Sequence, residues 1–308
     1  MKNIKFGLVI QGPVTTFGDG PNNSKEGFLT DDCINGNIES FSSLVEKIVI
    51  STWEGCGLSP TQSSSKVVII ENEAIHGFDF LNQRKQFFTT QSGVEWLRKN
   101  TDCTHVLKIR TDQLVPPELI PWLQNFYENS NFQARNQEDF LMFSEALKGE
   151  SFYAGDFMFA GTIKDISNFC RAVLCAEGRV HPMNSCDYVL KWLQLIDNKF
   201  LSDSSMLTRS FLTARNTLRI QYLWNEVLKD RICLPPKEIY KKIQWRGKPM
   251  PDVLESIDTA FFFNEDISSY DISPIRTRSI WKTYKLMRDY WKRYLMAKRD
   301  FEHKEGGA

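Results

Sequence analysis

Short, continuous runs of apolar and β-branched residues are the feature that most constrains the fold of this chain. The runs span residues 5–10, 47–53, 66–71 and 105–110. Segments with helical periodicity, at 31–44 and 82–99, lie between them. Because these strands are apolar without alternation, both of their faces must be buried, which is typical of parallel sheets covered by helices. The first half therefore predicts an α/β fold with a mostly parallel sheet flanked by helices.

The second half continues the same domain. Strands are predicted at 139–143 and 152–161, the latter interrupted by Gly155-Asp156, and helices at 165–177, 186–197 and 217–230. A long patterned helix is predicted from Ile275 to Glu305. Because no repeat or linker divides the chain, we expect one α/β domain at 1–270 and a basic, aromatic helical C-terminal extension at 271–308.

Composition excludes several classes of protein. The formal net charge is zero, so no global field attracts nucleic acid. The seven cysteines contain no CxxC pair, which favours reduced thiols in the cytoplasm over a zinc or disulfide site. The motifs GxGxxG and GxxxxGK[ST] are absent, which argues against dinucleotide enzymes and P-loop NTPases. No signal peptide and no apolar run long enough to span a bilayer is found.

Polar residues follow three of the predicted strands. In open α/β sheets, ligands bind outside the carboxyl ends of the strands. The residues to consider are therefore Gln11-Gly12-Pro13, Ser51 to Gly55, and Arg110 to Gln113.

The segment Arg110-Thr111-Asp112 ends the strand at 105–110 with opposite charges. A carboxylate in this place can ligate a divalent cation, and the guanidinium beside it can neutralise phosphate. The alternative is that Asp112 only caps the turn before Pro116, or pairs with Arg110.

Two further polar segments allow a functional or a structural interpretation. In the first, Trp53 can stack on a base, with Thr52 and Glu54 as hydrogen-bonding groups; alternatively the strand simply turns at Gly55. In the second, Asn82 is predicted to cap a helix, and the helix N-terminus with Arg84 can bind an anion or carry only solvated charge.

Asp156 lies within an apolar stretch. Burying an unpaired carboxylate is costly, so Asp156 is expected to have a partner or a role as a general base. The alternative is a β-bulge at Gly155, with Asp156 bonded to backbone.

Taken together, the ordered motifs resemble the WavE family of bacterial lipopolysaccharide and capsule synthesis. They are GLVIQGP (7–13), IVISTWEG (48–55), NQRKQ…TTQSGV (82–94), VLKIRTDQ (106–113) and FYAGDFMFAGT (152–162). The resemblance covers roughly residues 5 to 230 and implies a glycosyltransferase with the GT-A fold, in which one α/β domain binds a nucleotide-sugar.

The resemblance also implies roles for single residues. Asp112 matches the last acid of the DxD motif, which holds Mn²⁺ or Mg²⁺ on the donor diphosphate, whereas Arg110 replaces the first acid and can contact phosphate directly. Asp156 is the candidate base. We also expect an acidic residue immediately before Gln221, but this position is Ile220 here. Asp187 or Glu226 is then the substitute for that acid. The residues implied to line the nucleotide pocket are Gln11, Gly12, Pro13, Thr52, Trp53 and Glu54.

The extension adds a membrane hypothesis. Lys and Arg outnumber Asp and Glu in residues 276–305 and are interleaved with aromatic residues such as Trp281 and Trp291. Such a helix can dock on the anionic inner face of the inner membrane, or pack on its own domain by its aromatic face.

The leading prediction is a cytoplasmic or peripheral glycosyltransferase that moves sugar from a nucleotide-sugar to a glycan or lipid-linked glycan. One alternative is a sugar-phosphate nucleotidyltransferase, although Gln11-Gly12-Pro13-Val14 is a poor version of its glycine-rich loop. The other is a non-catalytic scaffold that binds nucleotide or sugar.

Overall fold

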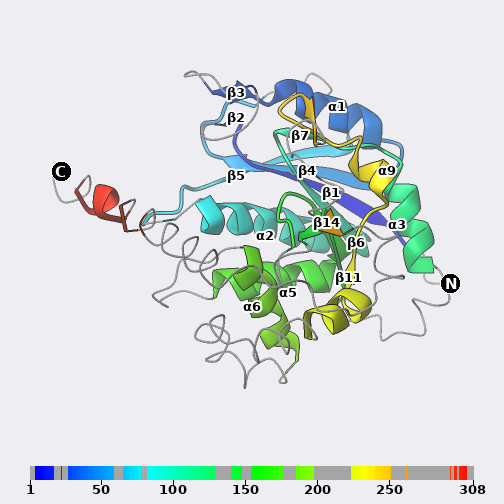
Figure 1. The fold of residues 1–308 in the computed structure, drawn as a ribbon. Coiled ribbons are helices and arrows are strands. Elements are labelled where there is room, and N and C mark those ends of the chain that lie inside the picture. Colours follow the sequence, from blue (N-terminus) through cyan, green and yellow to red (C-terminus); the bar gives the residue numbers. More distant parts are fainter. Residues whose placement is uncertain are drawn as a thin grey trace.

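The strands and helices form an α/β fold with one central sheet (Figure 1). The computed structural model describes residues 4–16, 22, 27–58, 65–77, 79, 82–128, 140–147, 154–175, 185–197, 223–250, 261–262, 292, 295–296 and 298–303.

The described strands of the central sheet follow the order β11-β8-β10-β6-β1-β4-β5. Their bounds are β1 Phe6–Gln11, β4 Lys47–Trp53, β5 Val67–Asn72, β6 His105–Arg110, β8 Leu141–Phe143, β10 Phe159–Thr162 and β11 Ile232–Cys233. Strand β10 runs antiparallel to both β6 and β8, whereas every other pairing in this sheet is parallel. The prediction of a mostly parallel sheet is confirmed.

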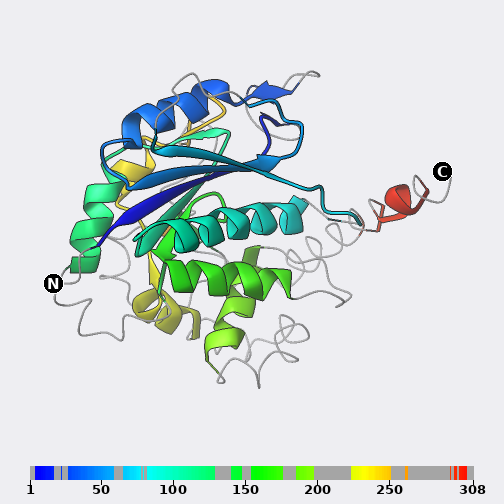
Figure 2. The same ribbon diagram turned by 180° about the vertical axis from the view of Figure 1, so that it is seen from behind.

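Helices cover both faces of the sheet, as Figures 1 and 2 show from opposite sides. The helices on one face are α1 Asp31–Phe41, α3 Leu119–Glu128 and α9 Lys237–Tyr240. The helices on the other are α2 Gln83–Asn100 and α5 Ile163–Leu174, with α6 Ser185–Ile196 packed beyond α5. In β1, Val9 enters the core beneath α2 while Leu8 and Ile10 enter the core beneath α1. This split explains why the strands lack a polar face.

The described residues also form three small antiparallel sheets beside the central one. Their pairs are β2 Thr15–Thr16 with β3 Phe28–Leu29, β9 Ala146–Leu147 with β14 Phe261–Phe262, and β7 Gln113–Leu114 with the hairpin β12 Gln244–Trp245 and β13 Lys248–Pro249. The hairpin turns at Arg246 and Gly247, which both have positive φ, as a two-residue β-hairpin loop requires.

The strand predicted at 152–161 is shorter than expected. Ala154 makes only an isolated bridge to Ala146, and the regular strand begins at Phe159. The backbone carbonyls of Asp156 and Phe157 accept hydrogen bonds from the side chain of Lys108, so this part of the chain has partners outside a strand ladder.

The predicted C-terminal extension falls largely outside the described residues. Its described part is helical at 292, 295–296 and 298–303, with Leu295 and Met296 exposed. No helix within the described ranges is long and apolar enough to cross a membrane.

Candidate functional site

The ends of three parallel strands bring predicted site residues together. Gln11, the last residue of β1, is the register partner of Arg110 in β6 and of Ser51 in β4. Successive connections lead from β1 to β4 and β5 on one side, whereas β6 lies on the other side of β1. The boundary between β1 and β6 is thus a topological switch point, where α/β sheets bind ligands.

Gly12 lets the loops after β1 and β6 approach each other. Its φ is +138°, and a Cβ atom there would lie 2.6 Å from Oγ1 of Thr111. The same Thr111 hydroxyl donates to the carbonyl of Pro13 at 2.8 Å. The Gln11-Gly12-Pro13 segment is therefore tied directly to the loop that carries Asp112.

Asp112 is fully buried and receives four side-chain hydrogen bonds. Arg110 donates from Nε to Oδ1 at 2.9 Å and from Nη2 to Oδ2 at 3.0 Å. Trp245 Nε1 and Arg246 Nε each donate to Oδ2 at 3.1 Å. Burial alone would raise the pKa of Asp112, but Arg110, Trp245 and Arg246 together hold it below its ordinary value. The carboxylate is therefore ionised and shared between two guanidinium groups.

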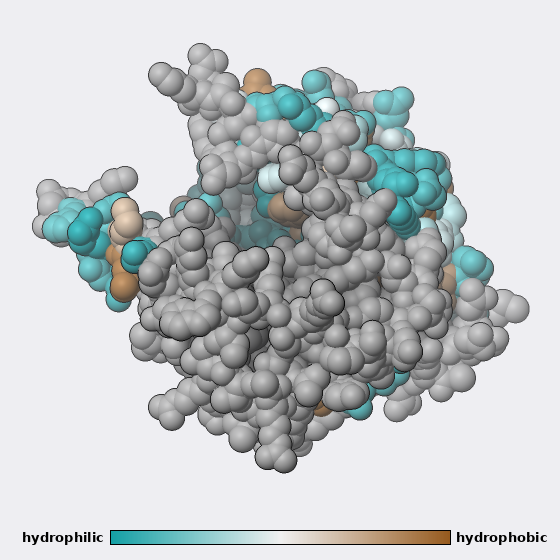
Figure 3. Space-filling model, in the orientation of Figure 1, coloured by the Kyte–Doolittle hydropathy of each residue, from teal (hydrophilic) through white to brown (hydrophobic). Residues whose placement is uncertain are grey.

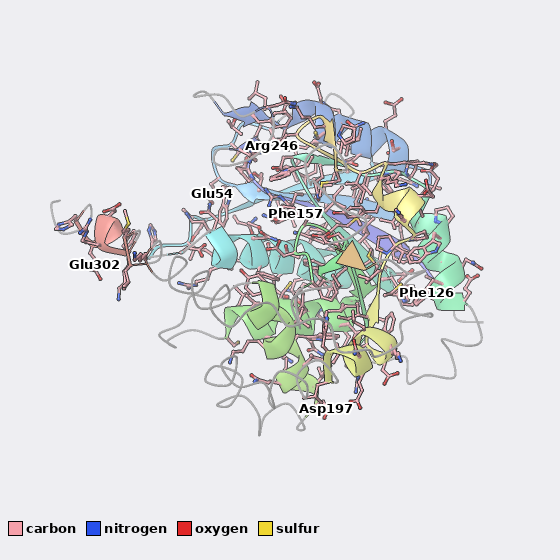
Figure 4. All side chains as sticks on the ribbon, in the orientation of Figure 1. Glu54, Phe126, Phe157, Asp197, Arg246 and Glu302 are labelled. Atoms are coloured by element: carbon pink, nitrogen blue, oxygen red, sulfur yellow. The ribbon has the colours of Figure 1, made fainter. Side chains whose placement is uncertain are left out.

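Aromatic rings fix these guanidinium groups in place. The guanidinium of Arg110 lies 4.9 Å from the ring centroid of Phe157, and Phe157 lies 5.1 Å from Trp245. Figure 4 labels Phe157 and Arg246, and Figure 3, drawn in the same orientation, shows a hollow in the surface in the part of the view where Figure 4 labels Phe157. The Arg110 side chain keeps 23% of its surface exposed, whereas Arg246 keeps 3%. Of the two, Arg110 is the one that a ligand can reach.

Both oxygens of Asp112 are occupied in this arrangement, so a divalent cation would have to displace an arginine or Trp245 to reach them. Both carboxylate oxygens already accept hydrogen bonds from cations. A dication bound there would be attracted by the carboxylate but repelled by both guanidinium groups. Within the described ranges, no three His, Cys, Asp or Glu residues are grouped to hold a metal ion. Asp112 has the contacts of an anchor for arginine, and its predicted role as a metal ligand stays a prediction.

Asp156 lies at the same edge of the sheet, in the half-buried loop before β10. Its backbone carbonyl accepts hydrogen bonds from Lys108 Nζ at 2.8 Å and Gln86 Nε2 at 2.9 Å. Lys108 is completely buried, and burial lowers its pKa to about 7 against the opposing effect of Asp156. The backbone that carries the predicted base is thus anchored from β6 and from α2.

Glu145 is a buried carboxylate in this region for which no role is predicted from the sequence. It follows β8, is 3% exposed, and its Oε2 has no hydrogen-bond partner among the described residues. Its carboxyl group packs against Gly155, where a Cβ atom would lie 2.0 Å from Oε1. Burial raises the pKa of Glu145 to about 7, with a further contribution from Asp156.

The end of β4 presents the residues predicted for the nucleoside. Thr52 is fully buried and its hydroxyl has no hydrogen-bond partner in the described part of the chain, whereas Glu54 is exposed. The half-buried ring of Trp53 is nearly parallel to that of Phe88, with centroids 6.4 Å apart, and Phe88 is 38% exposed. A flat aromatic surface therefore lies beside the switch point.

The N-terminus of α2 differs from the prediction. Asn82 has φ +58° and makes no side-chain capping bond, so the predicted cap is wrong. Asp79 takes that role, because its two carboxylate oxygens accept from the backbone N–H groups of Arg84 and Lys85, both at 2.9 Å. With these N–H groups occupied, the helix end does not offer them to an anion; the predicted phosphate contact of the Arg84 side chain remains a prediction.

Of the two substitute acids, only the Glu226 side chain is described, and it is not brought into this group. Asp187 belongs to α6, and its side chain lies outside the described atoms. Glu226 is exposed on a helix that ends immediately before β11, at the edge where the parallel strands begin. Trp245 and Arg246 were not predicted as partners of Asp112. They follow it in the chain by 133 and 134 positions, and no local pattern marks them as its partners.

Comparisons with known proteins give distant structural similarities. No family model and no curated protein matches the sequence. A nucleotide-diphospho-sugar transferase from Desulfovibrio desulfuricans has a TM-score of 0.38 and 11% identity, over 62% of this chain and 76% of its own. A 4-diphosphocytidyl-2C-methyl-D-erythritol synthase from Anaerococcus prevotii has a TM-score of 0.37 and 10% identity, over 62% and 83%. HddC from Yersinia pseudotuberculosis, complexed with GMP-PN, has a TM-score of 0.30 and 13% identity, over 53% of this chain and 79% of its own. Because TM-scores this low do not establish a shared fold, the α/β assignment rests on the sheet itself.

Proposed function

We propose that this protein is a glycosyltransferase that uses a nucleotide-sugar donor. The observation that carries the proposal is Arg110, a partly exposed guanidinium that Asp112 holds at the switch point of a parallel sheet. A group with this charge and position suits a donor diphosphate. The flat surface of Trp53 and Phe88, two strands away, suits a nucleobase.

Asp156 is the residue proposed to act on the acceptor. A hydroxyl oxygen of the acceptor would attack the anomeric carbon of the sugar, and its proton would pass to the Asp156 carboxylate. The bond between that carbon and the phosphate oxygen breaks, and the nucleoside diphosphate leaves with the bonding electrons. Lys108 and Gln86 would contribute by holding the backbone of Asp156 in place.

A thermal-shift panel of nucleotide-sugars tests donor binding. A donor that binds the folded chain raises the melting temperature by mass action. We expect the shift to be lost in Arg110→Gln and kept in Arg98→Gln, a control in which the altered arginine pairs with Glu95 on the surface of α2. If no nucleotide-sugar produces a shift, the proposal fails.

Turnover assays separate the proposed reaction from its alternative. Incubation with the bound nucleotide-sugar should release a nucleoside diphosphate when an acceptor glycan is added. Formation of pyrophosphate from a nucleoside triphosphate and a sugar phosphate would instead identify a nucleotidyltransferase. Asp156→Asn should abolish turnover while leaving the donor-induced shift intact.

The finer proposal is that the acceptor is a bacterial surface glycan, such as lipopolysaccharide core, O-antigen or capsule, built on a lipid at the inner face of the inner membrane. It is motivated by the sequence resemblance and by the excess of Lys and Arg in residues 276–305.

A further inference from the structure

Asp112 supports two arginines that come from distant parts of the chain. Arg110 ends β6, and Arg246 occupies the turn of the β12–β13 hairpin. The backbone N–H of Arg246 also donates to the carbonyl of Asp112 at 2.8 Å, so with Trp245 Nε1 and Arg246 Nε the hairpin makes three hydrogen bonds to this residue. The positive φ of Arg246, +49°, is unusual for a residue with a side chain and shows how strongly these contacts determine the turn.

The two guanidinium groups share one buried carboxylate. Asp156 is a second carboxylate that interacts electrostatically with Arg110. Asp112 uses both of its oxygens on the arginines and Trp245. On Arg110, by contrast, Nη1 makes no hydrogen bond to any described residue, and the side chain reaches the surface. Among the described residues, Arg110 therefore keeps a donor available for an anion.

We propose that the Arg110–Asp112–Arg246 cluster binds the donor diphosphate without a divalent cation. This inference rests on the proposed function and specifies how its leaving group is held. Arg110 would contact the phosphate oxygens directly through Nη1. Arg246 is buried and would act as a positioning residue for Arg110, because both bind the same Asp112 carboxylate and Arg246 adds positive charge. Asp112 would orient both guanidinium groups and would not ligate metal.

Binding of nucleoside diphosphates in EDTA and in Mn²⁺ tests the inference. The probes are ADP, GDP, CDP, UDP and dTDP, each compared with its monophosphate, and the readouts are thermal shift and calorimetric titration of the full chain. We expect one diphosphate to bind equally well in both conditions and better than its monophosphate. Arg110→Gln should weaken that binding roughly tenfold or more, as expected for loss of a hydrogen bond to a charged group. Arg98→Gln should leave it unchanged.

Asp112→Asn separates the two possible roles of the carboxylate. If Asp112 anchors arginine, the variant is less stable but still binds the diphosphate in EDTA, since both cations remain. Titration with Mn²⁺ alone should then give the same result for wild type and variant. If Asp112→Asn does not fold, the comparison of wild type with Arg110→Gln in EDTA decides.

Three outcomes would contradict the inference, and they can be told apart. Diphosphate binding that requires Mn²⁺ would overturn the inference and leave the proposed function standing. Metal-free binding that is unchanged in Arg110→Gln would also overturn it. Absence of binding by every diphosphate and every nucleotide-sugar would overturn both the inference and the proposed function.

Discussion

At the residue scale, Glu145 is a carboxyl group that the fold keeps largely protonated below neutral pH. Its pKa rises from 4.5 unfolded to about 7 folded, so below pH 4.5 both states are protonated and burial is not penalised electrostatically. As the pH rises from 4.5 to 7, only the unfolded state loses the proton, and the folded protein loses stability. Above pH 7 the loss is complete and amounts to about 3 kcal/mol.

Glu145→Gln should remove this pH-dependent loss. We expect the variant to gain stability relative to wild type between pH 5 and pH 8, measured as the free energy of urea unfolding at each pH. Glu39→Gln, on the exposed face of α1, is the control and should show no such trend. A difference between Glu145→Gln and wild type that does not change with pH would contradict the prediction.

Gly12 and Gly55 both have positive φ but differ in their surroundings. A Cβ atom at Gly12 would meet the Thr111 hydroxyl at 2.6 Å, whereas at Gly55 it would meet nothing within 4 Å. Gly55→Ala should therefore cost only backbone strain, about 1 kcal/mol, and Gly12→Ala should cost about 1–3 kcal/mol more. Urea unfolding of the two variants checks this, and equal costs would show that the loops after β1 and β6 can separate freely.

At the element scale, the first turn of α2 is bonded both to the loop before the helix and to the backbone of the candidate base. Asp79 caps the backbone of Arg84 and Lys85, and Gln86, one residue later, bonds to the carbonyl of Asp156. Farther along, Gly93 lets the helix approach β1 so closely that a Cβ atom there would lie 2.8 Å from Val9. The first turn of α2 is thus held at both the capping loop and the site.

Asp79→Ala should fray this first turn. We expect a loss of about 1 kcal/mol in unfolding free energy, the usual value of a helix cap. Hydrogen exchange should become faster at the N–H groups of Arg84 and Lys85 and stay unchanged in β1. Asp102→Ala, which removes an exposed carboxylate 3.7 Å from Lys5, is the control and should cost little. Unchanged exchange at Arg84 would contradict the capping role.

At the scale of the whole molecule, the sequence was sufficient for the order of the main elements. The strands predicted at 47–53 and 105–110 are β4 and β6, because a run of apolar residues in a doubly covered sheet depends little on distant context. The meeting of Gln11 with Arg110 followed from the same rule. The partners of Asp112 did not, since Trp245 and Arg246 reach it through pairing of β12 with β7, which no local pattern encodes. Glu145 was missed for a similar reason: its burial depends on Gly155 across a loop.

The distribution of charge over the whole molecule concerns the C-terminal extension. The chain is neutral in total, but Lys and Arg outnumber Asp and Glu in residues 276–305. A variant truncated after residue 275 should lose binding to vesicles that contain anionic lipid at low salt, and wild-type binding should weaken at high salt. Co-sedimentation with anionic and with neutral vesicles measures both effects. Binding that survives the truncation would exclude the extension as the membrane contact.

The attachment of the β12–β13 hairpin to Asp112 also has a consequence for the order in which the protein is made. Residues 4–128 contain β1, β4, β5 and β6, and so most of the parallel strands, but they supply only Arg110 to the buried carboxylate. The remaining donors leave the ribosome more than a hundred residues later. A nascent chain that stops before the hairpin therefore has an incomplete polar cluster at its sheet edge. Competence to bind an anion there should appear only when synthesis has passed residue 250.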